Sequence, residues 1–197
     1  MIGASSPRHR DGPLWQTSPG PQAAFNILIA LMLKPGYFFR RMRVDGSNVP
    51  ARLFLVLVAG AIGLGWYTLD LLISRHGQVR ALTGGLIVCD SVIVLCYIEA
   101  LGVVYFSRRR GWRVPMKLAE RIVCYSSVGW APAAAVMFIA MYLHGSGTLD
   151  QWMSRLLGVW GPWQSLALLV LIAAVAMLGF EVLVWIGVRR TKHANSP

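Results

Sequence analysis

Four long apolar segments constrain this chain more than any other feature of its sequence. They cover residues 53–73, 82–106, 122–143 and 163–188. Each segment is long enough to cross about 30 Å of hydrocarbon as an α-helix. Because hydrocarbon offers no water to bond the backbone, a crossing segment must satisfy its own peptide groups, as a helix does. The sequence therefore predicts an all-α integral membrane protein with four transmembrane helices.

The composition excludes several other classes of protein. Hydrophobic residues make up 56% of the chain and charged residues only 14%, which is unusual for a water-soluble domain. The net charge of +11 comes from short basic clusters between the apolar segments rather than from one continuous soluble face. We therefore expect membrane lipids with anionic headgroups as partners, and no nucleic acid.

The distribution of basic residues predicts the orientation. Of the 19 Lys and Arg residues, seven precede the first apolar segment, six lie in the loop after the second and three follow the fourth. The remaining three are Arg75, Arg80 and Arg155. Positive charge is retained in the cytoplasm, so we expect both termini on the cytoplasmic side of a bacterial cytoplasmic (inner) membrane.

The rest of the chain divides around these spans. Residues 1–21 and 189–197 are expected to be cytoplasmic tails, the first disordered, and residues 22–188 a single membrane domain. Residues 22–33 are apolar but too few to span, which favours a short interfacial helix. Aromatic and aliphatic residues at helical spacing predict a second short helix over residues 148–160, on the outer surface.

Two segments resemble a known family of membrane proteins. Leu33–Arg43 (LKPGYFFRRMR) with the following Val49 and Pro50, and Ala119–Ser127 (AERIVCYSS) with Pro132, resemble the membrane domain of the Yip family of Ypt-interacting, Rab-associated proteins, in its bacterial form. The resemblance implies a helical membrane domain with a cytoplasmic N-terminus. It implies no catalytic residues, although the eukaryotic members act in vesicle traffic.

Acidic residues inside the spans are the first candidates for a polar site, because an ionisable group in hydrocarbon is costly unless it is paired, neutral or hydrated. Glu99 and Glu181 each lie seven residues before the end of their segment, so we expect them at similar depth, with Tyr125 nearby. They either share a proton or bind a cation, or each is neutral or paired with Arg108 or Arg121 and fixes helix packing.

Asp90 is the third candidate of this intramembrane polar site. It precedes Glu99 by nine residues, and nine helical residues rotate by half a turn, so the two acids should face opposite sides of their helix.

Small and basic residues supply the other candidate contacts. Ala59 with Gly63, and Ala61 with Gly65, form small-xxx-small pairs that let a neighbouring helix approach closely. Pro132 should kink the third span. The candidate contacts for anionic lipid or a protein partner are Arg40, Arg41, Arg43, Arg108, Arg109, Arg110 and Arg113.

No motif for catalysis, metal binding or a cofactor is found in the sequence, so we expect a protein that is not an enzyme. The preferred interpretation is a scaffold, an assembly factor or an accessory subunit of a membrane complex, with other membrane proteins or a second copy as partner. The alternative is a small transporter or channel component that uses Glu99 and Glu181.

Overall fold

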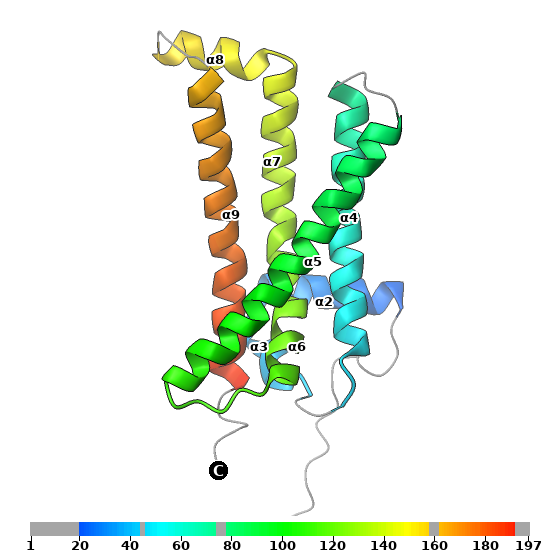
Figure 1. The fold of residues 1–197 in the computed structure, drawn as a ribbon, viewed down its shortest axis with the longest axis vertical. Coiled ribbons are helices and arrows are strands. Elements are labelled where there is room, and N and C mark those ends of the chain that lie inside the picture. Colours follow the sequence, from blue (N-terminus) through cyan, green and yellow to red (C-terminus); the bar gives the residue numbers. More distant parts are fainter. Residues whose placement is uncertain (1–19, 44–45, 74–77, 158–161, 192–197) are drawn as a thin grey trace, which may run out of the picture.

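The computed structural model describes residues 20–43, 46–73, 78–157 and 162–191, and every regular element among them is helical. Four helical segments are long and apolar enough to span a membrane (Figure 1): α4 (Val49–Ile73), α5 (Gln78–Arg109), Met116–Gly145, and Val170–Thr191 within α9 (Pro162–Thr191). The predicted all-α fold of an integral membrane protein with four transmembrane helices is confirmed. The helices extend beyond the predicted apolar segments because hydrocarbon thickness limits only their apolar part.

The third span is interrupted by a tight turn just ahead of Pro132. It consists of α6 (Met116–Ser126), a 3₁₀ turn (Ser127–Gly129) and α7 (Trp130–Gly145). The tight turn precedes Pro132, which has no N–H to donate to the carbonyl four residues earlier, so the chain ahead of it takes up i→i+3 bonding. A Cβ at Gly129 would lie 2.8 Å from the Cα of Phe180, so close packing on α9 also needs a glycine in this turn.

Short helices lie across the bundle at two levels. α2 (Pro21–Leu33) runs transversely behind the spans and buries Ile27 and Leu31 (Figure 1). It is followed directly by α3 (Pro35–Arg41), which contacts α9. α8 (Thr148–Leu157) lies crosswise at the opposite end of the bundle (Figure 1). These helices match the predicted segments 22–33 and 148–160, although residues 158–160 and most of the two tails lie outside the described residues.

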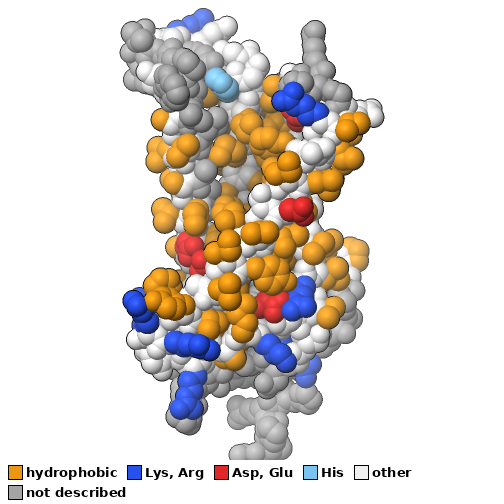
Figure 2. All heavy atoms as spheres, in the orientation of Figure 1, with side chains coloured by type: hydrophobic (Ala, Val, Ile, Leu, Met, Phe, Trp, Pro, Cys, Tyr) orange, Lys and Arg blue, Asp and Glu red, His pale blue; other side chains and the backbone are white. Residues whose placement is uncertain are grey.

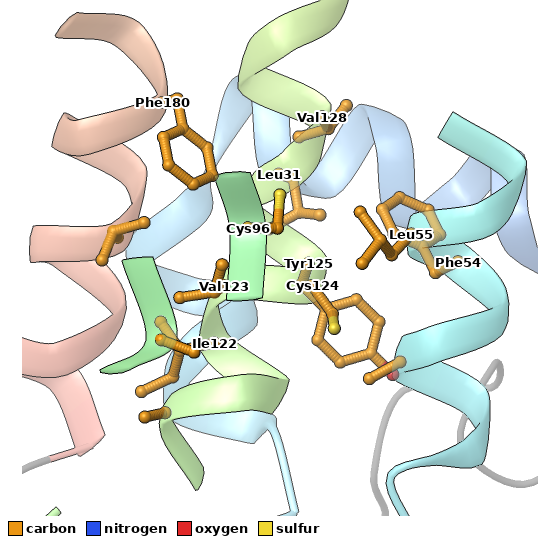
Figure 3. Close-up of a cluster of buried hydrophobic side chains, with 14 of the residues drawn as sticks. Leu31, Phe54, Leu55, Cys96, Ile122, Val123, Cys124, Tyr125, Val128 and Phe180 are labelled. Carbon is orange, nitrogen blue, oxygen red and sulfur yellow. The ribbon is translucent and has the colours of Figure 1, made fainter. Parts of the chain in front are cut away.

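The packed core surrounds α6. Every residue from Leu118 to Ser126 is buried, because α3, α4, α5 and α9 all lie around this helix. Figure 3 shows the centre of this core, to which α2, α4, α5, α6, the 3₁₀ turn and α9 contribute: Leu31, Phe54, Leu55, Cys96, Ile122, Val123, Cys124, Tyr125, Val128 and Phe180. In α7, by contrast, Ala140 is the one buried residue.

The bundle has two chemically different ends. The end at which α3, α6 and the last turn of α9 lie gathers Lys and Arg side chains (Figure 2). We call it the basic end; its residues are Arg40, Arg41, Arg43, Arg52, Arg108, Arg109, Arg110, Arg113, Lys117, Arg121, Arg189 and Arg190.

Candidate functional site

Glu99 of α5 and Glu181 of α9 line the same cavity. The cavity has a volume of about 280 Å³ and lies between these two helices and the chain that follows α5. Its lining comprises Glu99, Val103, Phe106, Ser107, Arg110, Trp112, Glu181, Val184, Trp185 and Val188. We call it the acid-pair cavity. The two glutamates, which the sequence predicts at a similar depth, therefore share one space in the fold.

The two carboxyl groups line this cavity from two helices and lie near enough to repel each other when both are charged. Both glutamates are half-buried, and Oε2 of Glu99 lies 3.9 Å from the position of a Cβ at Gly102, so the carboxyl folds along α5. Two negative charges at such a distance repel strongly in a medium of low dielectric constant. The position of both glutamates in one cavity suits a cation bound between them.

Ser107 adds a hydroxyl to the same cavity. Its residue is only 3% exposed and lies eight residues after Glu99, about 12 Å farther along α5. Aromatic rings of Phe106, Trp112 and Trp185 line the cavity as well.

Arg110 stands over the ring of Trp112, with Cζ 5.5 Å from the ring centroid. Arg189 stands over Trp185 in the same way, at 5.0 Å. These cations are therefore held against aromatic faces at the basic end.

Asp90 and Tyr125 do not belong to the acid-pair cavity. Asp90 is exposed on α5, in keeping with the half-turn that separates it from Glu99. Tyr125 is fully buried between the rings of Phe38 and Phe54, with centroid distances of 5.1 and 5.5 Å. The proposed group of four residues thus separates into a pair of acids, an exposed aspartate and a tyrosine of the core.

A second polar cluster was not anticipated from the sequence. Glu120, at the start of α6, accepts a hydrogen bond from Nε of Arg52 at 2.5 Å and one from Nδ2 of Asn48 at 2.8 Å. The hydroxyl of Tyr97 approaches the same carboxylate at 3.4 Å. The Glu120 side chain is 7% exposed, whereas that of Arg52 is 56% exposed. The ion pair therefore joins α4 to the central helix at the edge of the core.

Arg121 extends this cluster to the chain that precedes α4. Its Nη2 donates to Oδ1 of Asn48 at 2.8 Å and to the carbonyl of Gly46 at 2.9 Å, and its Nη1 donates to the carbonyl of Arg43. We call Asn48, Arg52, Tyr97, Glu120 and Arg121 the polar junction. Arg121 was one of the predicted partners for the glutamates of the acid-pair cavity, but these bonds direct its guanidinium to a different part of the bundle.

The candidate basic contacts all lie at the basic end (Figure 2). Arg40, Arg41 and Arg113 are exposed, as are Arg108, Arg109 and Arg110, while Arg43 is partly buried. Two further arginines of the set stand over tyrosine rings: Arg41 over Tyr37 at 4.6 Å, and Arg109 over Tyr105 at 4.9 Å. Paired cations and aromatic rings of this kind are typical of the level of lipid headgroups.

The glycines of the two small-xxx-small pairs, both on α4, face two different neighbouring helices, α5 and α7. Ala59 and Gly63 are buried, and a Cβ at Gly63 would lie 2.5 Å from the backbone oxygen of Gly85 in α5. Gly65 packs on the ring of Phe138 in α7, whereas Ala61 is exposed. Pro132 is also exposed and lines a groove between α7 and α9.

The fold and these two polar sites define a helical membrane protein with four spans and an acid pair between two of them. Among the described residues, no three His, Cys, Asp or Glu side chains lie close enough to hold a metal ion. Comparison with protein-family models, with curated proteins and with solved structures finds no match. Membership of the Yip family therefore stays a prediction from the two segments that resemble it.

Proposed function

We propose that this protein is a non-enzymatic, Yip-like membrane protein that acts as a scaffold, an assembly factor or an accessory subunit of a membrane complex. Its basic end faces the cytoplasm of a bacterial cell, and the complex resides in the cytoplasmic membrane. The distribution of Lys and Arg along the sequence supports this orientation.

The polar junction is the observation that carries the proposal. Its charged side chains bond to one another and to backbone carbonyls, and in this way they tie α4, α6 and the chain after α3 into one unit. Holding these segments together fixes the surface of the basic end before any partner binds. A preorganised surface loses less conformational entropy on association, which suits a docking role.

The test is crosslinking in native membranes, followed by purification in mild detergent and identification of every protein retained in near-stoichiometric amount. We expect one defined set of membrane proteins to be retained by the wild-type chain. The triple variant Arg108→Gln, Arg109→Gln, Arg110→Gln should lose it. The matched control is Arg80→Gln with Arg155→Gln, which removes charge at the opposite end and should retain the set. Retention of no partner by the wild type would contradict the proposal.

The acid-pair cavity favours a second candidate function, a small transporter or channel component. Glu99 and Glu181 come from two different spans and line one cavity in the membrane-spanning part of the bundle. Acids in such positions occur along ion and proton pathways. Proton or cation flux into liposomes that falls with Glu99→Gln and with Glu181→Gln, in a protein purified without partners, would favour this function over the first.

A further inference from the structure

Asp90 is an acid on the outer side of a span. It lies in α5, eight residues after the start of the apolar segment 82–106, which places it about 12 Å inside that segment. The residue is exposed, and the described part of the chain provides neither an ion pair nor a hydrogen bond for its carboxyl group. In Figure 1, α5 crosses in front of the other spans, and Figure 2 shows mainly hydrophobic side chains around it. Charged residues of spans rarely face lipid, which indicates that another molecule covers this one.

The other polar side chains on the outer side of α5 are satisfied within the chain. The hydroxyls of Thr83 and Ser91 donate to carbonyl groups one turn earlier on the same helix, at 2.9 and 2.7 Å. The hydroxyl of Tyr97 lies 3.4 Å from the carboxylate of Glu120. A carboxylate only accepts hydrogen bonds, and the N–H groups inside a helix already bond to its own carbonyls. Asp90 therefore needs a donor from outside α5.

Asp90 lies in a row of exposed residues with the spacing of a helix contact. These residues recur on α5 at alternating intervals of four and three, as in a coiled coil. We call them the α5 seam: Thr83, Ile87, Asp90, Val94, Tyr97 and Leu101. Ile87 and Leu101 are both 61% exposed, so no helix of the described chain covers the seam. A polar residue within such a seam fixes the register of the partner helix.

We propose that the α5 seam binds a transmembrane helix of another membrane protein, and that this helix carries a lysine or arginine whose side chain pairs with Asp90. The inference rests on the proposed role as a scaffold or accessory subunit, and it names the chemistry of the partner. A second copy of this chain does not fit, because the apolar segments 53–73, 82–106, 122–143 and 163–188 contain no Lys or Arg. A twofold contact along the seam would instead bring two like charges together.

Lipid and the basic residues of α5 itself do not supply this partner. Aspartate has a single methylene, so its carboxyl group does not reach the headgroups across about 12 Å as a long lysine or arginine side chain does. Arg80, the nearest basic residue of α5, lies ten residues away, about 15 Å along the helix. A cation on a facing helix, by contrast, donates directly to the carboxylate, and the two charges attract strongly where the dielectric constant is low.

The experiment places the photocrosslinking residue benzoylphenylalanine at Ile87 or at Val94 of the full chain. Native membranes are irradiated, and the crosslinked proteins are identified by mass spectrometry. The matched control has the same residue at Leu95, which is exposed at a similar depth but is turned about 100° from Val94 around the helix. We expect one membrane protein from both seam positions and none from Leu95. The crosslinked peptide should belong to an apolar span that contains a lysine or arginine.

Substitution of Asp90 tests the charge in the same assay. Asp90→Asn should lower the crosslinking yield about tenfold or more, because the partner's cation loses its counter-charge, and Asp90→Glu should retain most of the yield. Ser91→Ala removes a neighbouring exposed hydroxyl and should leave the yield unchanged. Unfolding of Asp90→Asn in SDS-containing micelles should match the wild type, so a lower yield is not explained by misfolding. The seam crosslinks themselves are measured with Asp90 in place.

Four results would overturn the proposal: crosslinks to a second copy, no protein from either seam position, an unchanged yield in Asp90→Asn, or a crosslinked span without a basic residue. Benzoylphenylalanine at Arg109, at the basic end, reports on the proposed function separately. A protein crosslinked from Arg109 but not from the seam would overturn this inference alone. No protein crosslinked from any of these positions would contradict both the inference and the proposed function.

Discussion

The carboxylate of Glu120 accepts the Nε–H of Arg52 at 2.5 Å, although 68 residues of chain separate the two. The next residue, Arg121, points to Asn48 and to the carbonyl of Gly46. Two adjacent residues of α6 therefore bind two different segments, the start of α4 and the chain ahead of it. Asn48 links the Arg52–Glu120 ion pair to Arg121, because its amide donates to Glu120 while its oxygen accepts from Arg121.

Replacing Arg121 by methionine should destabilise the protein strongly. The side chain is 2% exposed, and its loss leaves Asn48 and the carbonyls of three residues, Arg43, Gly46 and Ser47, without their donor. Breaking a buried, charged hydrogen-bond network of this size costs about 3 kcal/mol. The measurement is the free energy of unfolding in mixed detergent and SDS micelles.

Two variants control this prediction. Arg121→Lys should recover little of the stability, because an ammonium lacks the planar set of donors that reaches several acceptors at once. Arg113→Met removes an exposed arginine of the same basic end and should leave stability unchanged. A lysine variant as stable as the wild type would show that charge alone, rather than the geometry of the guanidinium, holds the junction.

The contact between α4 and α5 provides a second prediction. Gly63→Ala places a Cβ 2.5 Å from the backbone oxygen of Gly85, which cannot move without shifting the helix, so we expect a loss of about 2 kcal/mol. Gly60→Ala, one turn earlier on α4, meets no atom within 4 Å and should be neutral or slightly stabilising. Thermal unfolding of the two variants in one detergent compares them directly, and equal midpoints would contradict the close packing.

The features that depend on the length of the apolar segments and on helical spacing could be predicted from the sequence. Four spans followed from the length of the apolar segments, and close packing at Gly63 followed from a small residue four positions after Ala59. The similar depth of Glu99 and Glu181 followed from their equal distances to the segment ends, whereas their place in one cavity depends on how α5 and α9 pack. In each case a local property, helix rise or side-chain size, determines the result.

The polar junction could not be predicted in the same way. Glu120 and Arg121 precede the third apolar segment and resemble ordinary charged residues of a loop, so nothing local indicates that α6 is the buried centre of the bundle. Their partners Asn48 and Arg52 are set by tertiary packing across about 70 residues. The position of the 3₁₀ turn likewise depends on contact between Gly129 and Phe180 in α9, as well as on Pro132.

The acid pair should appear as an energetic coupling between two helices. In a double-mutant cycle with Glu99→Leu and Glu181→Leu, we expect a coupling free energy of about 1 kcal/mol, because the two side chains line one cavity. Asp90→Leu combined with Glu181→Leu should instead be additive, since Asp90 lies outside the cavity. Unfolding in SDS-containing micelles gives all the values, and additivity in the first cycle would exclude a direct interaction.

Anionic lipid should bind preferentially at the loop after α5. Arg108, Arg109 and Arg110 are exposed, and each basic residue near an anionic surface contributes about 1 kcal/mol. Changing all three to glutamine should reduce the retention of phosphatidylglycerol in native mass spectrometry, whereas Arg80→Gln with Arg155→Gln should not. Retention that is equal in both variants would place the lipid contacts elsewhere.

Cysteine labelling tests the proposed orientation. Arg113 at the basic end and Gln151 on α8 are both exposed and stand at opposite ends of the bundle, and the native Cys96 and Cys124 are buried. With the basic end in the cytoplasm, a membrane-impermeant maleimide should label Gln151→Cys in cells whose cytoplasmic membrane is intact. Arg113→Cys should react only after that membrane is permeabilised, and the unsubstituted chain reports labelling of the native cysteines, among them the partly buried Cys89. The reverse labelling pattern would show that the protein has the opposite orientation, with the basic end and the polar junction on the outer side of the membrane.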